Sequence, residues 1–294
     1  MKISVTLSLI GILLIGVAEN GWTAKVALLI PQDRINAGDD PVNDPAAKEA
    51  TLQTLQDRGD LGIYWLVQHL EKDLGHKVNL YGTDNDDPSQ VVKENDLIFI
   101  SEAIGSDSVA GDYRESTIPV IFTESYLLDN MGFTNGASAF TGGAMTNEVK
   151  IVNSNHPITK GLPPTFFVST KDPNTGNPYI VTFGTVNDLS ILADVGQVLV
   201  VIPSSIDEAN GDPLPENAPI VMAVEAGTPL DTGDKNSARW VFLGYSDVIP
   251  NADYNGDPTT RTLSVLSQPG IQLLDQSIAW ALGKTTQVSD WLLY

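Results

Sequence analysis

Two glutamates and one histidine are the residues whose types could support acid–base chemistry. Glu102 and Glu124 each follow an apolar run that predicts a buried strand, and His156 stands before a proline in the segment NSNHPITKGL. Two carboxylates at the ends of parallel strands could serve as general acid and base or bind a cation, with His156 as an assistant. The alternative is structural, because acidic residues favour turns and helix caps and His-Pro favours a turn. We favour the turn for His156.

A second candidate is a surface calcium (Ca²⁺) site in the segment DYNGD. Asp253, Asn255 and Asp257 place oxygen ligands two residues apart, as the first part of a calcium-binding loop does. The glutamate that an EF-hand needs at the twelfth position is absent, because Ser264 stands there. A looser calcium site remains the expectation. No other cofactor is expected, since no glycine-rich phosphate loop follows the first predicted strand.

Composition excludes several functional classes. The 294 residues carry a net charge of −21, from 37 acidic and 16 basic residues, so a nucleic-acid backbone or an anionic membrane surface would be repelled. The chain contains no cysteine, which excludes disulfides, thiolate metal sites and a cysteine nucleophile. Such acidity is typical of a soluble protein in a salty or extracellular setting.

Residues 1–18 have the layout of a secretory signal peptide. Lys2 precedes an apolar run that ends at Val17, and the small residues Gly16 and Ala18 form a cleavage pattern. The run is shorter than the roughly 20 residues of a spanning helix, so no membrane span is expected. We expect secretion to the cell surface, the periplasm or the medium. Secretion without disulfides favours a bacterial or archaeal protein.

The elements that must position these residues alternate between strand and helix. Apolar runs predict buried strands at residues 25–30, 97–101 and 120–123, with helical spacing at residues 61–74. This alternation predicts an α/β fold with a doubly wound, mostly parallel sheet. After residue 147, short β-branched segments predict added antiparallel strands in the second half. Residues 31–50, rich in Asp, Asn, Gly and Pro, predict a long loop, and residues 270–283 predict a closing helix.

The order of these segments resembles the class I glutamine amidotransferase-like superfamily, in its divergent ThuA-like branch. The resemblance is carried by the segment from Asn95 to Phe133, by NSNHPITKGL, and by RWVFLGYSD with the later LLDQSIAWALG. It implies one flavodoxin-like, amidotransferase-like α/β domain over residues 19–284, followed by a C-terminal tail at 285–294. Amidotransferases of this superfamily use a cysteine nucleophile. Because this chain has no cysteine, glutaminase chemistry is excluded.

These features predict an exported, non-amidotransferase binding or assembly module at the cell surface or outside the cell. Its ligand would be a protein or a carbohydrate, and homo-oligomerisation stays open. The alternative is a secreted hydrolase, directed at carbohydrate as the ThuA-like resemblance implies, which uses carboxylates at the C-terminal edge of the sheet. A close cluster of Glu102, Glu124 and His156 would favour the enzyme, and their dispersal would favour the module.

Export predicts a defined mature amino terminus. We expect cleavage after Ala18, so amino-terminal sequencing of secreted material should read Glu-Asn-Gly-Trp from Glu19 onward. A chain that stays in the cytoplasm with Met1 intact would contradict this prediction.

Overall fold

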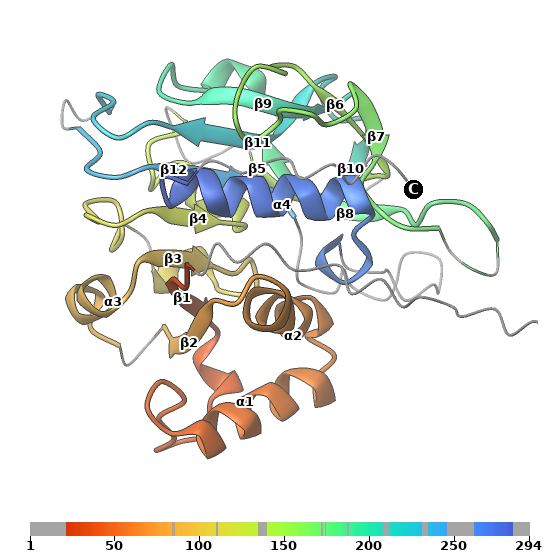
Figure 1. The fold of residues 1–294 in the computed structure, drawn as a ribbon. Helices are drawn as coiled ribbons and strands as arrows, with labels where there is room; N and C mark the ends of the chain where they lie inside the picture. The colour runs from red at the N-terminus through yellow and green to blue at the C-terminus, as the bar shows by residue number, and fades with distance from the viewer. Residues whose placement is uncertain are drawn as a thin grey trace, which may run out of the picture.

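The computed structural model describes residues 22–83, 86–109, 111–134, 140–171, 173, 175–186, 188–207, 212–230, 235–245 and 262–284. The predicted signal peptide, the C-terminal tail and the calcium ligands Asp253, Asn255 and Asp257 lie outside these residues. The described residues form a nine-stranded sheet with the order β2-β1-β3-β4-β12-β11-β9-β6-β7, and a three-stranded sheet with the order β10-β5-β8 (Figure 1).

The first five strands of the large sheet are mutually parallel. Their order, β2-β1-β3-β4-β12, is the flavodoxin-like arrangement with the last strand of the chain as the fifth member. All five are almost wholly buried, which explains why their sequences read as continuous apolar runs. The bounds are β1 Lys25–Ile30, β2 Lys77–Gly82, β3 Leu97–Ile100, β4 Val120–Phe122 and β12 Trp240–Leu243.

The remaining strands are antiparallel, as the sequence predicts for the second half. In the large sheet β11, β9, β6 and β7 extend the parallel half beyond β12, and the exposed and buried residues of β6 and β7 alternate. The bounds are β11 Ala218–Val224, β9 Gln197–Ile202, β6 Glu148–Ile151 and β7 Thr165–Phe167 in this sheet, and β5 Phe140–Thr146, β8 Val181–Val186 and β10 Ile206–Asp207 in the small one.

Helices cover both faces of the parallel half, so the sheet is doubly wound. Helices α1, α2 and α4 share one apolar cluster with the sheet, and α3 contributes to the cluster on the other face. Figure 1 shows α4 lying across the middle of the sheet. Among the described helices none has both the length and the apolar character that a membrane crossing requires. The bounds are α1 Pro45–Asp57, α2 Leu61–Gln68 with a π-helical turn at His69–Asp73, α3 Pro88–Glu94 and α4 Gln268–Ala281, with 3₁₀ turns at Gln32–Arg34, Ser106–Ser108, Ser125–Leu127, Leu189–Ile191 and Thr262–Val265.

The predicted long loop is wrong in its second part, because α1 begins at Pro45. Asp44 caps this helix, with its Oδ1 accepting a hydrogen bond of 2.8 Å from the Ala46 amide, and Pro45 occupies the first helical position. An aspartate followed by proline is a helix-start signal as well as a turn signal, and the turn-rich composition of the preceding residues obscured it.

A buried histidine joins α4 to the first half of the chain. His69 is 5% exposed and stacks on Trp65 with 4.8 Å between ring centroids. Its Nε2 lies 2.7 Å from Asp275 of α4, and its Nδ1 lies 2.9 Å from Asp73. Burial by itself would lower the pKa of His69, but the hydrogen bonds and charges of Asp275 and Asp73 outweigh it and raise the pKa. The imidazolium therefore donates from both ring nitrogens.

This contact predicts a pH-dependent contribution to stability. Because the folded pKa of His69 is raised, the contribution is full below the unfolded pKa of about 6.5 and is lost as the pH rises through the folded pKa. Replacing Asp275 with asparagine should lower the free energy of unfolding at pH 6 by about 1.5–3 kcal/mol and flatten its pH dependence. Urea denaturation from pH 6 to pH 9 measures this, with the exposed Asp107→Asn as the matched control. Parallel curves for Asp275→Asn and the wild type would contradict the assignment.

Candidate functional site

The register of the parallel sheet places the two candidate glutamates at the same level. Ile100 of β3 pairs with Phe122 of β4, and Glu102 and Glu124 each follow two residues later. Neighbouring strands lie about 4.8 Å apart, so the two backbones remain adjacent at this edge. Thr123 joins them, because its Oγ1 accepts a 2.8 Å hydrogen bond from the Glu102 amide and donates a 3.3 Å bond to the Ile100 carbonyl.

Glu124 caps the 3₁₀ turn that follows β4. It is 6% exposed, and its Oε1 accepts a 2.7 Å hydrogen bond from the Tyr126 amide. Its φ of −73° and ψ of 112° are ordinary extended values. A nucleophile elbow requires a sharp, strained strand-to-helix turn, and among the described non-glycine residues only Asn217 has a positive φ. Glu124 therefore acts as the N-cap of the 3₁₀ turn after β4, and the backbone there lacks the strain of a nucleophile elbow.

The serines at this edge are enclosed. Ser101 and Ser125 are fully buried, and the Ser101 Oγ accepts a 3.1 Å hydrogen bond from the Ala103 amide. Strand β8 closes over the end of β4, since a Cβ built on Gly184 would lie 3.0 Å from the Ser125 Cβ. The Gly184 amide also donates a 2.9 Å hydrogen bond to Gly244, just beyond β12. Neither serine presents a hydroxyl group to solvent.

His156 lies at the opposite, amino-terminal edge of the parallel strands. Its ring centroid is 5.0 Å from that of Trp280 in the last turn of α4, and the guanidinium of Arg239 lies 4.7 Å from the Trp280 ring. Arg239 directly precedes β12, whose first residue pairs with Val120 at the start of β4. Glu124 is four residues beyond Val120, which corresponds to about 13 Å along a strand. The structure therefore brings Glu102 and Glu124 to one edge and leaves His156 at the other.

The local contacts of His156 are those of a turn residue. Its Nδ1 accepts a 3.2 Å hydrogen bond from the Ile158 amide, and its carbonyl accepts 3.0 Å bonds from the amides of Thr159 and Lys160. Burial lowers the pKa of His156, and the charge of Arg239 lowers it further against the opposing effect of Glu225. The ring is thus neutral near pH 7, with its proton on Nε2 and the lone pair of Nδ1 occupied. This geometry leaves the ring no free basic nitrogen.

A cavity of about 580 Å³ opens at the carboxyl ends of β1 and β2. Ligands bind at this edge in open α/β sheets. The cavity lies beside the switch point between β1 and β3, where the order of the strands in the sheet reverses. Gln32, which lines the cavity, packs closely against Gly82, because a Cβ built on Gly82 would lie 1.8 Å from the Gln32 Oε1. That oxygen is buried and has no hydrogen-bond partner among the described residues. The walls are Gln32, Ile35, Asn36, Ala37, Gly38, Asp39, Asp40, Pro41, Leu80 and Asp86.

The charged residues that line this cavity are all acidic. Burial raises the pKa of Asp86, and the nearby charge of Asp40 raises it further, although the Gly82 amide opposes both effects. Hydrogen bonds from Asn43 lower the pKa of Asp40, which stays ionised. The Asp39 Oδ2 accepts a 3.0 Å hydrogen bond from Asn36. The site therefore favours hydrogen-bond donors and positive charge.

The sequence predicted a polar loop at residues 31–50, which contains Asp39 and Asp40, but it did not single out Gln32 or Asp86. The signal that could have pointed to them is Gly82 at the end of a buried strand. A glycine in that position often marks a close approach of another group to the backbone, which here is the side chain of Gln32.

Comparison with solved structures identifies the fold. No protein-family model and no curated protein matches the sequence. The structure of a ThuA-like protein from Parabacteroides merdae matches 91% of this chain and 93% of its own, with 11% identity and a TM-score of 0.51. The chain has a ThuA-like fold. A ThuA-like protein from Bacteroides uniformis also matches, with 16% identity over 91% of this chain and 95% of that chain and a TM-score of 0.44. A glutamine amidotransferase from Thermotoga maritima matches 75% of each chain, with 8% identity and a TM-score of 0.35.

The match to the Parabacteroides merdae structure confirms the fold expected from the resemblance, and at 11% identity the likeness concerns the fold alone. In this chain Glu124 lies two residues beyond the end of β4, and the whole sequence contains no cysteine.

The turn at His156 predicts a graded response to substitution. In His156→Asn the new Oδ1 can accept the hydrogen bond from Ile158, so the free energy of unfolding should fall by less than about 1 kcal/mol. His156→Ala leaves that amide without its acceptor and should cost about 1–3 kcal/mol. Both variants lose the ring contact with Trp280, so the difference isolates the hydrogen bond. Equal losses in urea denaturation would show that the hydrogen bond does not hold the turn.

Proposed function

We propose that the protein is an exported, non-amidotransferase binding or assembly module that acts at the cell surface or outside the cell. The dispersal of the candidate catalytic residues carries this proposal. His156 lies at the edge of the sheet opposite Glu102 and Glu124, and its Nδ1 is used in a turn. Glu124 caps a helical turn, and the nearby serines are enclosed. Glu124, Ser101 and Thr123, at the ends of β3 and β4, accept hydrogen bonds from backbone amides and so stabilise the local turns.

The acidic cavity at the carboxyl ends of β1 and β2 is the proposed ligand site. Asp39, Asp40 and Asp86 supply carboxylate acceptors to the cavity wall. Ligands that present donors fit this lining: the hydroxyl groups of a carbohydrate, or basic side chains of a partner protein or of a second copy of the chain.

Export and calcium binding belong to the same proposal. Secretion rests on the signal-peptide layout of residues 1–18, together with the net charge of −21 and the lack of cysteine. A calcium ion would be held by oxygen ligands from Asp253, Asn255 and Asp257. Acidic exported proteins meet calcium at concentrations where such loose sites fill.

A carbohydrate-directed, secreted hydrolase is the competing proposal. The matched register of Glu102 and Glu124 favours it, because two carboxyl groups on adjacent strands can share a bound substrate. His156 has no part in this version, since it lies at the other edge of the sheet.

Substitution of the two glutamates separates these proposals. For the binding module, we expect the mature chain to cleave chromogenic glycosides no faster than the Glu102→Gln and Glu124→Gln variants do. A glycan array should show binding that Asp86→Asn weakens and that Asp107→Asn, an exposed control, leaves unchanged. Glycoside turnover that falls by about 10²-fold or more in Glu102→Gln at an unchanged melting temperature would overturn the module and establish the hydrolase.

A further inference from the structure

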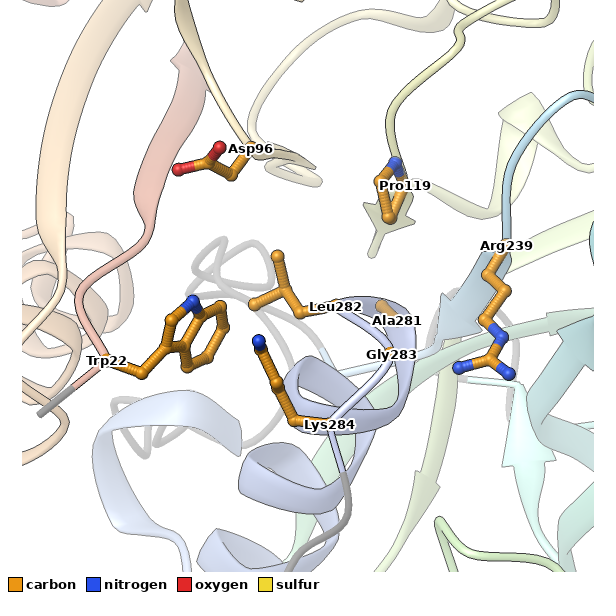
Figure 2. Close-up of a pocket in the computed structure, with 8 residues that line it drawn as sticks. All are labelled: Trp22, Asp96, Pro119, Arg239, Ala281, Leu282, Gly283 and Lys284. Atoms are coloured by element: carbon orange, nitrogen blue, oxygen red, sulfur yellow. The ribbon is translucent and has the colours of Figure 1, made fainter. Parts of the chain in front are cut away.

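A second cavity, of about 410 Å³, lies at the amino-terminal edge of the parallel strands. Asp96 and Pro119 line it from the starts of β3 and β4, and Arg239 from the start of β12. Trp22, three residues before β1, and the end of α4 complete the wall (Figure 2). Cavities of this size hold a small molecule. The opposite edge of the sheet holds the ligand site proposed above, so the two sites are separate.

The end of α4 fixes one charged group of this cavity. Gly283 has a φ of +69°, its amide donates a 2.9 Å bond to Trp280, and the Lys284 amide donates a 2.8 Å bond to Ala279. This paired pattern is a Schellman motif, which ends a helix in a defined geometry. Lys284 is therefore placed by the backbone, and Figure 2 shows its side chain reaching alongside Trp22.

The ammonium group of Lys284 is available to a ligand. It lies 4.7 Å from the centre of the Trp22 ring and forms no hydrogen bond or ion pair within the described part of the chain. Arg239, on the other side of the helix end, bonds Glu225 through Nε at 2.9 Å and the Trp280 carbonyl through Nη1 at 2.6 Å. Its Nη2 makes no hydrogen bond with described residues. Both cationic residues line the cavity, on opposite sides of the helix end, and Lys284 is the one whose charge has no acidic partner among the described residues.

The rest of the lining adds apolar surface and one acceptor. Trp22, Pro119 and Leu282 present ring and aliphatic carbons. Asp96 accepts a 2.8 Å hydrogen bond from the Lys25 amide through Oδ2, and its Oδ1 has no partner among the described residues. The cavity therefore combines a site for an anionic group, a flat apolar wall and an acceptor for a hydroxyl group.

We propose that this cavity binds a hexuronate, a sugar ring that carries one carboxylate. The carboxylate would pair with the ammonium group of Lys284, which can donate up to three hydrogen bonds. The less polar face of the ring would lie against Pro119 and Leu282, beside Trp22, whose ring face carries the Lys284 ammonium group. A ring hydroxyl would donate to Asp96. A neutral sugar lacks the first contact, and a simple carboxylate such as acetate lacks the other two.

Titration of the full mature chain with sodium D-glucuronate, D-glucose and sodium acetate tests this inference. The chain has five tryptophans, and the indole N–H signal of Trp22 can be identified by its loss in Trp22→Phe. We expect glucuronate to shift this signal saturably and to bind about tenfold more tightly than glucose or acetate. Lys284→Gln should weaken glucuronate binding about tenfold or more. Lys150→Gln removes an exposed lysine from the outer face of β6 and should leave binding unchanged.

Each other outcome overturns the inference. Equal binding of acetate and glucuronate would indicate a simple anion site, and equal weakening by Lys284→Gln and Lys150→Gln would indicate general electrostatics. The absence of a saturable shift would show that the cavity takes no hexuronate. None of these results bears on the binding-module proposal, which concerns Glu102, Glu124 and the acidic cavity and is tested by different variants.

Discussion

The pairing of β12 with β4 is the contact on which the rest of the structure depends. The last strand among the described residues enters the sheet beside a strand from the first half, with Trp240 opposite Val120 and Phe242 opposite Phe122. Aromatic rings hold this pairing on one face, where Phe122 lies 5.4 Å from Phe242 and 5.5 Å from Phe133. Such ring pairs add about 0.5–1.5 kcal/mol each beyond the area that they bury, which helps to offset the entropy of closing a long loop.

The same pairing decides which part of the carboxyl edge is open. Gly244 follows β12 and accepts a hydrogen bond from Gly184 of β8, so the small sheet lies directly against the ends of β4 and β12. A side chain on Gly244 would place its Cβ 2.2 Å from the Gly184 carbonyl oxygen, and a glycine is therefore required there. Gly184 packs against Ser125, which is fully buried. Among the described residues, an open cavity of this edge lies at β1 and β2.

The parallel half could be predicted because strands buried on both faces must be apolar throughout, and β1, β3 and β4 are. The start of α1 could not be predicted from the sequence, because an Asp-Pro pair such as Asp44 and Pro45 is as common in a turn as at the start of a helix. The glutamates were placed correctly at the carboxyl edge because position after a parallel strand determines the edge. His156 was beyond prediction, because its edge depends on the direction of β6, which only the strand order reveals.

Strand direction also decides at which edge of the sheet a charged residue lies. Residues that precede the parallel strands gather at one edge, where Lys25, Lys77 and Asp96 lie, and residues that follow the strands gather at the other, where Asp40 and Glu102 lie. A six-residue strand spans about 20 Å, whereas charges are screened over about 8 Å at physiological ionic strength. The two edges are therefore electrically independent, and the net charge of −21 does not determine what each can bind. The proposed carboxylate site at Lys284 on the amino edge is therefore compatible with the proposed acidic ligand site on the opposite edge.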